Sequence, residues 1–588
     1  MAISMAKLLK EAFKEAGIDL PKAESHPSVH AKQILKLKKP ITAKTAPTRV
    51  SPASTRLKSK PNQTPPDTQK KKRLNTESYT SGMPGVSPVQ AKKTVPEREP
   101  DFELSLAPSA VAQLGSESSL NGGKRINPSF DGRRTIMHSQ PAAYPDLELK
   151  LGIDFGTSCT KIVIADPQQD KAFAVPFLDN PGISRYLLPG IVFKGNDYHF
   201  EEHGKALRDL KLSLLEKTVR PEDLIHSTAF LALAIRHARG WLFTEHATLY
   251  RKSTIAWTLC LGMPSDNPND PLLKPRFELL GIAAWMAAGS DKPMTNQLLE
   301  HCLLQAEIIQ KGGPSAPVLD LEIRAVPELA AQVYGHVASE SFDPKGHNTF
   351  MMVDVGAGTV DSCLFHVHRD NKTKRWNFLM FTKAVEGNGS INLHRQRFDW
   401  WKRALQRFNP ERTDLIKAID NAHYRSDCLT IIPPQLEDYI AGTTIRFDSN
   451  EIHPDTIFLK KRLKKQVLFT TYAEARNQQH LRENDLKNMP TFLCGGGMRM
   501  PFYQQLHTEL DKPDPSASWL KAQCMELSKP RKMLAPGLPS GDYDRLSVAY
   551  GLGMMDFGIL EQSMGSTLPP RLISRSSLEG EYVSKDMM

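Results

Sequence analysis

Two segments of the sequence join an aspartate to a polar turn between apolar strands. Residues 149–165 have a strand–turn–strand pattern, with β-branched residues on both sides of Gly156, Thr157 and Ser158. This turn offers two hydroxyl groups and several free N–H groups, which suit a phosphate, and Asp154 beside it suits a hydrated Mg²⁺. Because turns of this kind also close ordinary hairpins, the first segment alone leaves both interpretations open.

The second segment, residues 351–365, repeats the design 200 positions later, with Asp354 in the place of Asp154. Its turn is richer in glycine, so backbone N–H groups can approach a phosphate closely, and Asp361 adds a second carboxylate. The turn residues are Gly356, Ala357, Gly358 and Thr359. The repetition predicts a duplicated domain whose two lobes face each other across a nucleotide. Two structural hairpins remain the alternative, which requires two coincidences.

A third element, residues 492–501, again leads from a strand into a glycine turn and then towards a helix near Pro501. Its three consecutive glycines, Gly495, Gly496 and Gly497, leave room for a flat base or ribose. Arg499 could lay its planar guanidinium group against a purine.

The elements that must position these turns follow an α/β pattern. Strand-like runs at residues 186–193 and 254–262 flank a helix that begins at Pro221, where proline and two acidic residues suit the first turn. Strands that alternate with helices predict an α/β body.

Charge and composition divide the chain. Residues 1–140 carry 24 Lys and Arg against 12 Asp and Glu, whereas the rest of the chain is nearly neutral. Proline, serine and lysine dominate this part, so we expect a disordered basic arm over residues 1–145, with an amphipathic helix over residues 3–16. The expected domains are a first lobe at 146–345, a second at 346–562 and a flexible tail at 563–588.

The arm leaves several partners open. The helix could dock in a partner's groove or fray without one. The basic runs at 36–39 and 70–73 could contact nucleic acid, an acidic protein or an anionic membrane, but no aromatic residues interleave them, so a solvated linker is favoured. We expect a protein partner or adaptor, with nucleic acid less favoured and no membrane.

Cysteines and apolar runs bear on the compartment. The seven cysteines show no paired or zinc-binding spacing, which is typical of reduced thiols. No apolar run reaches the roughly 18 residues of a membrane span. Glu11 and Glu15 stand where a signal peptide would need an apolar core. The expected location is the cytoplasm.

In these motifs the sequence resembles the nucleotide-binding domain of the DnaK-type heat-shock chaperones, within the actin/hexokinase/heat-shock superfamily. The resemblance covers about residues 146–560. The matching segments are the two aspartate turns at 154–158 and 354–361, the adenosine loop at 495–501, the D-x-A-V-A-Y-G-like segment at 544–551, the connection at 327–331 and the glycine turn at 387–390.

The resemblance implies a two-lobed actin-like ATPase fold made of duplicated ribonuclease-H-like domains around a nucleotide cleft. It also implies ATP or ADP and Mg²⁺ as cofactors, with Asp154 and Asp354 ordering the metal's water shell. Asp361 and Glu328 would position the attacking water or the metal-bound waters. The nucleotide would be held by Gly156, Thr157, Ser158, Gly356, Ala357, Gly358, Thr359, Gly387, Gly495, Gly496, Gly497, Arg499 and Asp544.

Three departures from the family pattern matter. Where the family has a lysine that contacts phosphate, this sequence has Arg208 at the equivalent spacing, or Lys205 after a shift. Asn392 stands where the family has an aspartate after its glycine turn. Only 37 residues follow Gly551, too few for the family's peptide-binding domain and lid.

The leading hypothesis is a DnaK-like, Mg-dependent ATPase that acts on a partner through nucleotide-controlled lobe closure, without its own peptide-binding domain. One alternative is an actin-like, filament-forming ATPase of the DNA-segregation type. The other is a nucleotide-sensing scaffold that binds ATP without hydrolysing it, which the altered lysine position keeps open.

Overall fold

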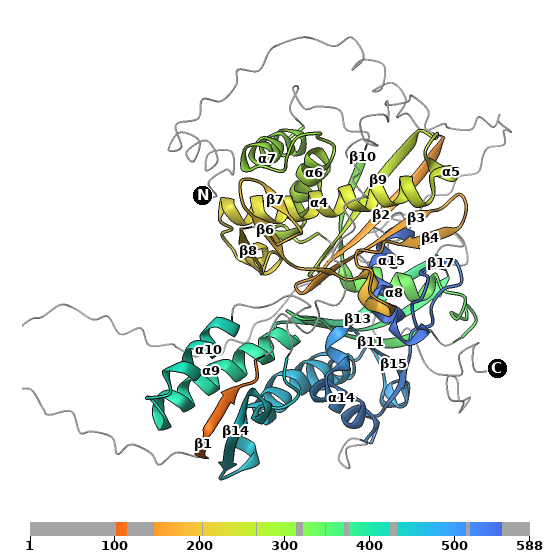
Figure 1. Ribbon diagram of the computed structural model, residues 1–588. Helices are drawn as coiled ribbons and strands as arrows, with labels where there is room; N and C mark the ends of the chain where they lie inside the picture. The colour runs from red at the N-terminus through yellow and green to blue at the C-terminus, as the bar shows by residue number, and fades with distance from the viewer. Residues whose placement is uncertain are drawn as a thin grey trace, which may run out of the picture. The chain divides into compact units, whose positions relative to one another are not determined.

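The computed structural model describes residues 102–114, 146–202, 204–265, 267, 269–312, 321–346, 348–369, 376–423, 432–512 and 518–555. They form a mixed α/β structure with several sheets, as the sequence predicted (Figure 1). All of them belong to one of the two compact units into which the chain divides, the one that includes residues 100–588. The predicted helix at 3–16 and the tail at 563–588 lie outside the described residues.

The first large sheet is built around strand β2. Its antiparallel neighbour β3 pairs in turn with β4, and on its other side β2 pairs in parallel with β9, which pairs with β10. The strands are β2 (Leu147–Phe155), β3 (Cys159–Asp166), β4 (Lys171–Ala174), β9 (Ile255–Met263) and β10 (Leu321–Pro327), with β5 (Leu188–Pro189) on β3 and β17 (Met533–Leu534) on β4.

The second large sheet has the same plan around strand β11. An antiparallel meander runs through β12 to β13 on one side, and the parallel strands β15 and β16 follow on the other. The strands are β11 (Thr349–Val355), β12 (Val360–Arg369), β13 (Trp376–Glu386), β15 (Met489–Cys494) and β16 (Ala522–Met525). Each predicted strand–turn–strand segment is therefore confirmed as the central hairpin of a sheet.

Two helices, α8 (Glu328–Val337) and α15 (Ser547–Met554), pack against each other and share a core with both sheets. Their contact depends on glycine. A Cβ atom at Gly551 would clash with the carbonyl oxygen of Ala331, and one at Gly335 would lie 2.8 Å from the carbonyl oxygen of Ser547. The pair also fixes the two chain segments that precede each helix.

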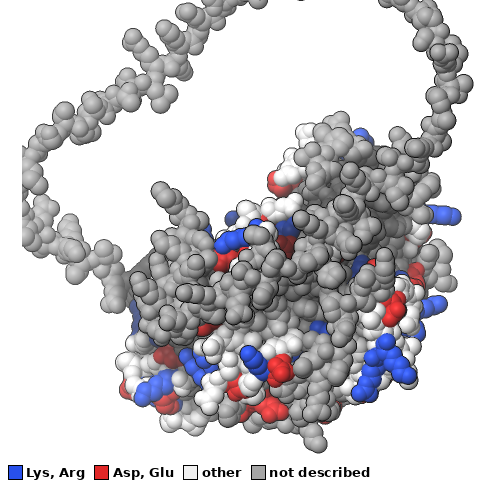
Figure 2. Space-filling view, turned by 90° about the horizontal axis from the view of Figure 1, so that it is seen from above, with Lys and Arg blue, Asp and Glu red and all other residues white. Residues whose placement is uncertain are grey.

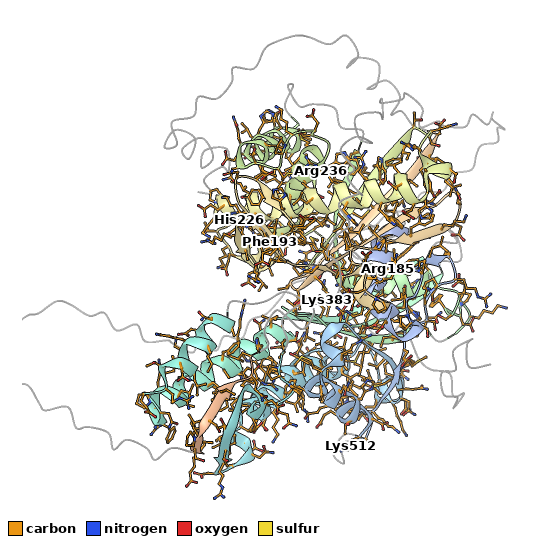
Figure 3. All side chains as sticks on the ribbon, in the orientation of Figure 1. Arg185, Phe193, His226, Arg236, Lys383 and Lys512 are labelled. Carbon is orange, nitrogen blue, oxygen red and sulfur yellow. The ribbon has the colours of Figure 1, made fainter. Side chains whose placement is uncertain are left out.

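Three helices share a core with the first sheet (Figure 1). They are α4 (Pro221–Glu245), α6 (Leu273–Ala288) and α7 (Asn296–Gln310). Arg236 of α4, labelled in Figure 3, donates to the carbonyl oxygens of Ala287 and Ala288 at the end of α6. These carbonyl groups lie in the last turn of α6, where charge-assisted hydrogen bonds from the buried guanidinium group join the two helices.

The outer core of the second sheet contains α14 (Pro501–Asp511) and two π-helical stretches, Leu459–Leu463 and Lys465–Ala473. Buried Gln466 donates to the carbonyl oxygens of Val360 and Ala384 and accepts from the side chain of Asn388. The π-helical segment is thereby bonded directly to the strands that carry the second aspartate turn. Lys460, Lys461 and Arg462 are on its exposed side.

The expectation that residues 1–145 are disordered throughout is wrong for residues 102–114. Residues Phe102–Ala112 form strand β1, which pairs antiparallel with β14 (Ile440–Phe447). The ring of Phe102 contacts those of Trp400 and Phe447, at centroid distances of 5.0 and 5.9 Å. The alternating apolar residues of this strand complete a small core with α9 (Ser390–Phe408) and α10 (Thr413–His423).

The other strands and α-helices in the described ranges are short. They are β6 (Val192–Lys194), β7 (Tyr198–His199), β8 (Lys205–Leu207), α5 (Ala247–Tyr250), α11 (Pro454–Phe458), α12 (Glu474–Asn477) and α13 (Glu483–Leu486). The six cysteines in the described ranges are free thiols. No helix within those ranges is long and apolar enough to span a membrane.

The glycine contact between α8 and α15 predicts an asymmetric effect of alanine. Gly551→Ala should lower the stability by about 1–3 kcal/mol, because the new Cβ atom forces the two helices apart. Gly553→Ala, in the same helix, is the matched control, since its Cβ atom would come no closer than 3.3 Å to any neighbour. Chemical denaturation of both variants measures the difference, and equal stabilities would contradict the prediction.

Buried His336 predicts an acid-sensitive core. Both of its ring nitrogens lack a hydrogen-bond partner, and burial among Phe342, Phe350 and Phe492 lowers its pKa to about 4. In the unfolded chain this imidazole binds a proton near pH 6.5. The stability that neutral His336 contributes is therefore fully present above that pH and is lost as the pH falls towards 4. At pH 5 this loss is about 2 kcal/mol.

His336→Leu should therefore remove about 2 kcal/mol of the difference in unfolding free energy between pH 7.5 and pH 5. The measurement is denaturant unfolding at both pH values. His507→Gln is the control, because His507 is exposed. An unchanged pH dependence in His336→Leu would show that this imidazole does not limit acid stability.

Candidate functional site

The two aspartate turns and the glycine triplet meet around one cavity of about 310 Å³. It is bounded by the turns after β2 and β11, the turn after β15, the start of α8 and the residues before α15. The lining comprises Asp154, Gly156, Thr157, Ser158, Cys159, Lys161, Leu187, Lys211, Glu328, Leu329, Gln332, Asp354, Gly356, Ala357, Gly358, Thr359, Asp361, Ser390, Ile391, Ile432, Gly495, Gly496, Gly497, Met500, Asp544, Arg545 and Val548.

The first hairpin places Asp154 opposite Lys161 in the pairing of β2 with β3. The Nζ atom of Lys161 lies 2.8 Å from Oδ2 of Asp154, and both side chains are almost wholly buried. Burial opposes the charged form of Lys161, but the adjacent carboxylate outweighs it and the pKa of Lys161 is raised. The sequence analysis did not single out Lys161, although its hairpin register with Asp154 was a usable signal.

The second hairpin places Asp354 directly opposite Asp361. Its turn touches the first turn, because a Cβ atom at Gly358 would lie 2.7 Å from the hydroxyl oxygen of Thr157. The two aspartate turns are therefore in van der Waals contact. This is the arrangement expected if both turns bind one ligand.

Gly387 is not among the residues that line the cavity. It supports the second turn from behind, because the Nδ2 group of Asn392 donates to the carbonyl oxygens of Gly358 and Gly387, at 2.6 and 3.2 Å. Asn392 thus has a local structural role, holding the glycine turn against the second hairpin.

The glycine triplet is required by three different close neighbours. A Cβ atom at Gly495 would collide with the carboxylate of Asp354, and one at Gly497 would collide with Val355. At Gly496 the neighbour is the guanidinium group of Arg545, 2.9 Å from the position of such a Cβ atom. In this structure the flat group that lies over the triplet belongs to the protein itself.

Arg499 does not line the cavity. It forms ion pairs with Asp544 and Asp542 and donates to the carbonyl oxygen of Gly495. Its hydrogen bonds to Asp544 raise the pKa of the guanidinium group. Asp544, which does line the cavity, also accepts from the backbone N–H of Gly495 at 2.8 Å. Arg499 therefore holds Asp544 and the glycine triplet in place.

The second lysine that lines the cavity, besides Lys161, is Lys211, and neither of the two basic residues expected from the family spacing lines it. Lys205 is exposed in β8, and Arg208 is half-buried and outside the lining. The Nζ atom of Lys211 lies 2.6 Å from Oε1 of Glu328, and their side chains are only 5% and 13% exposed. Burial raises the pKa of Glu328. Asp209, with φ of 58°, belongs to the turn between Arg208 and Lys211.

Glu328 and Gln332 occupy successive turns on one face of α8. Glu328 directly follows β10 and starts the helix, where the helix dipole favours an acidic side chain. The Nε2 group of Gln332 donates to Oδ2 of Asp354 at 2.8 Å and to the hydroxyl of Ser547 at 3.1 Å. Gln332 was missed from sequence, although its spacing of four from Glu328 was a signal.

Five carboxyl groups line the cavity. Burial is the main cause that raises the pKa of Asp354 to about 7 and that of Asp361 to about 8, and neighbouring carboxylates add to it. The Oδ1 atom of buried Asp361 has no hydrogen-bond partner. A cation close to these two carboxyl groups would favour their charged forms.

Among the described residues no group of three or more histidine, cysteine or acidic side chains is placed to hold a metal ion. The prediction that Asp154 and Asp354 bind Mg²⁺ through its water shell stays a prediction.

An ion pair stands beside this cavity. The Nη2 atom of Arg395, in α9, donates to both carboxylate oxygens of Asp209, at 2.9 and 2.7 Å. Asp209 lies two residues before Lys211, so this bond joins the loop that carries the cavity lysine to the helix that follows the second glycine turn.

Surface charge near the described elements is mixed. Figure 2 shows Lys and Arg interspersed with Asp and Glu over the described part of one face.

The chain was also compared with protein-family models and with characterised proteins, and neither comparison found a match.

Proposed function

We propose that this protein binds ATP in the cavity and hydrolyses it with Mg²⁺, in a two-lobed actin-like fold akin to the nucleotide-binding domain of DnaK-type chaperones. The observation that carries the proposal is the convergence of both aspartate turns and the glycine triplet on one cavity. The three segments come from widely separated parts of the sequence, so ordinary hairpins give no reason for them to meet.

The strand order of the sheets supports the proposed fold. In each sheet a central strand carries an antiparallel meander on one side and two parallel strands on the other. Asp154 and Asp354 occupy matching positions, each next to the end of its central strand. A duplicated ribonuclease-H-like domain, with one copy for each lobe, accounts for this repetition.

Binding would rest on the two turns and two lysines. The N–H and hydroxyl groups of Thr157, Ser158 and Thr359 can cradle phosphate oxygens, and Lys161 and Lys211 can neutralise their charge. Both lysines are held on carboxylates in this structure, at 2.8 and 2.6 Å, so they are preoriented. A bound phosphate would share these cations with Asp154 and Glu328.

Hydrolysis would use the buried acids around the second turn. Mg²⁺, when bound, would supply charge neutralisation for the phosphates and orient them for in-line attack. The unpartnered Oδ1 of Asp361 can accept a hydrogen bond, and then the proton, from an attacking water molecule. Glu328, bonded to Lys211, would hold that water in place. Nucleotide-dependent closure of the proposed lobes would then act on a partner recruited by the N-terminal arm.

The direct test is ATP binding and single-turnover hydrolysis by the full chain with Mg²⁺. Asp361→Asn should slow hydrolysis by about 10²–10⁴-fold and leave ATP affinity within a few fold, because the change removes a proton acceptor and keeps the shape. Asp154→Ala should weaken the Mg²⁺ dependence of binding.

Two results would go against this proposal. If the unchanged protein does not bind ATP, the nucleotide site is refuted. If it binds ATP without turnover, the ATPase activity is refuted and the protein is a nucleotide sensor.

A second test separates Lys211, which lines the cavity, from the two basic residues expected by the family spacing. Lys211→Ala should weaken ATP binding about 10–100-fold, since it removes a charge-assisted contact and leaves Glu328 unpaired. Arg208→Ala and Lys205→Ala should each cost clearly less, because neither residue lines the cavity. Isothermal titration calorimetry gives the affinities, with exposed Lys217→Ala as the control. A larger loss in Arg208→Ala than in Lys211→Ala would reverse the assignment.

A further inference from the structure

Arg545 is a third cation in the cavity, and no motif of the resemblance gives it a role. It is the last residue of the 3₁₀ turn Ser540–Arg545, two residues before the start of α15 at Ser547. Its neighbour Asp544 is fixed by Arg499 and by the N–H of Gly495. The residue that directly precedes Arg545 is therefore fixed in place.

The guanidinium group of Arg545 joins two of the three cavity loops. It lies flat over Gly496, where the Cζ, Nη2 and Nη1 atoms are 2.9, 3.0 and 3.1 Å from the position of an added Cβ atom. Its Nη2 group also donates to Sγ of Cys159 at 3.6 Å. Cys159 directly follows Ser158, so this end of the group reaches the first aspartate turn.

The charge of Arg545 is not compensated as those of the lysines are. Lys161 and Lys211 each have a carboxylate within 2.8 Å, whereas within the described ranges Arg545 has a thiol as its polar contact and no ion pair with a carboxylate. The charge of Arg545 also acts against protonation of Lys161. A partly buried cation of this kind favours an anion as its partner.

We propose that Arg545 binds a phosphate group of the nucleotide and so couples the first turn to the glycine triplet. The inference rests on the proposed function. A guanidinium group offers several N–H donors in one plane, so it can contact the phosphate while its flat face stays on Gly496. A phosphate is favoured over the base as its target, because the donor that reaches Cys159 points to the turn that carries Thr157 and Ser158.

The test compares ADP with adenosine, which lacks the phosphates. Binding to the full chain is measured by calorimetry for the unchanged protein, Arg545→Lys and Arg545→Gln. The ADP affinity should fall in that order, with Arg545→Gln weaker by about 10–100-fold, and the adenosine affinity should stay within about twofold. Arg251→Gln is the matched control, because Arg251 is exposed and lies outside the cavity lining.

Thermal unfolding of each variant verifies that it folds, and Arg545→Lys keeps the test valid if Arg545→Gln does not. An unchanged ADP affinity in both variants would overturn the assignment. A higher ADP affinity would overturn it too, because Arg545 would then hinder ADP binding. Equal losses for ADP and adenosine would also overturn it, in favour of a contact with the nucleoside. If the unchanged protein binds neither compound, the proposed function itself fails, which is a distinct result.

Discussion

The close contact between α8 and α15 is the constraint on which the cavity depends. The two helices can approach only because Gly335 and Gly551 lack side chains, and they share one core with both large sheets. Glu328 begins one helix, and Arg545 lies two residues before the first residue of the other. A wider spacing would move an acid and a cation away from the two aspartate turns, so the packing of these two helices affects the charge distribution in the cavity.

Buried charge is the second theme, and it explains which polar groups are paired. The acidic side chains that line the cavity repel one another when charged. Lys161 forms an ion pair with Asp154, Lys211 forms one with Glu328, and the side-chain amide of Gln332 donates a hydrogen bond to Asp354. The pKa values of Asp354 and Asp361 stay raised, mainly because both groups are buried and also because neighbouring carboxylates oppose their ionisation.

Local chemistry made most of the site predictable from sequence. Strand patterns around Asp154 and Asp354 and the glycine triplet are short-range signals, and all three lie where expected. Lys211 escaped because a turn at Asp209 shifts the lysine three residues beyond the family spacing. The strand Phe102–Ala112 escaped for another reason, since its period-two apolar pattern is embedded in a polar, proline-rich composition and its partner lies more than 300 residues away.

Strand β1 changes how the N-terminal region should be handled experimentally. A truncation that begins at residue 146, where composition changes, would delete the partner of β14 and uncover Trp400, Phe447 and the small core beneath them. Poor expression or aggregation of such a fragment would then reflect an exposed apolar face rather than the loss of a partner-binding arm. A shortened protein meant to isolate the arm's contribution should therefore keep the chain from Phe102 onward.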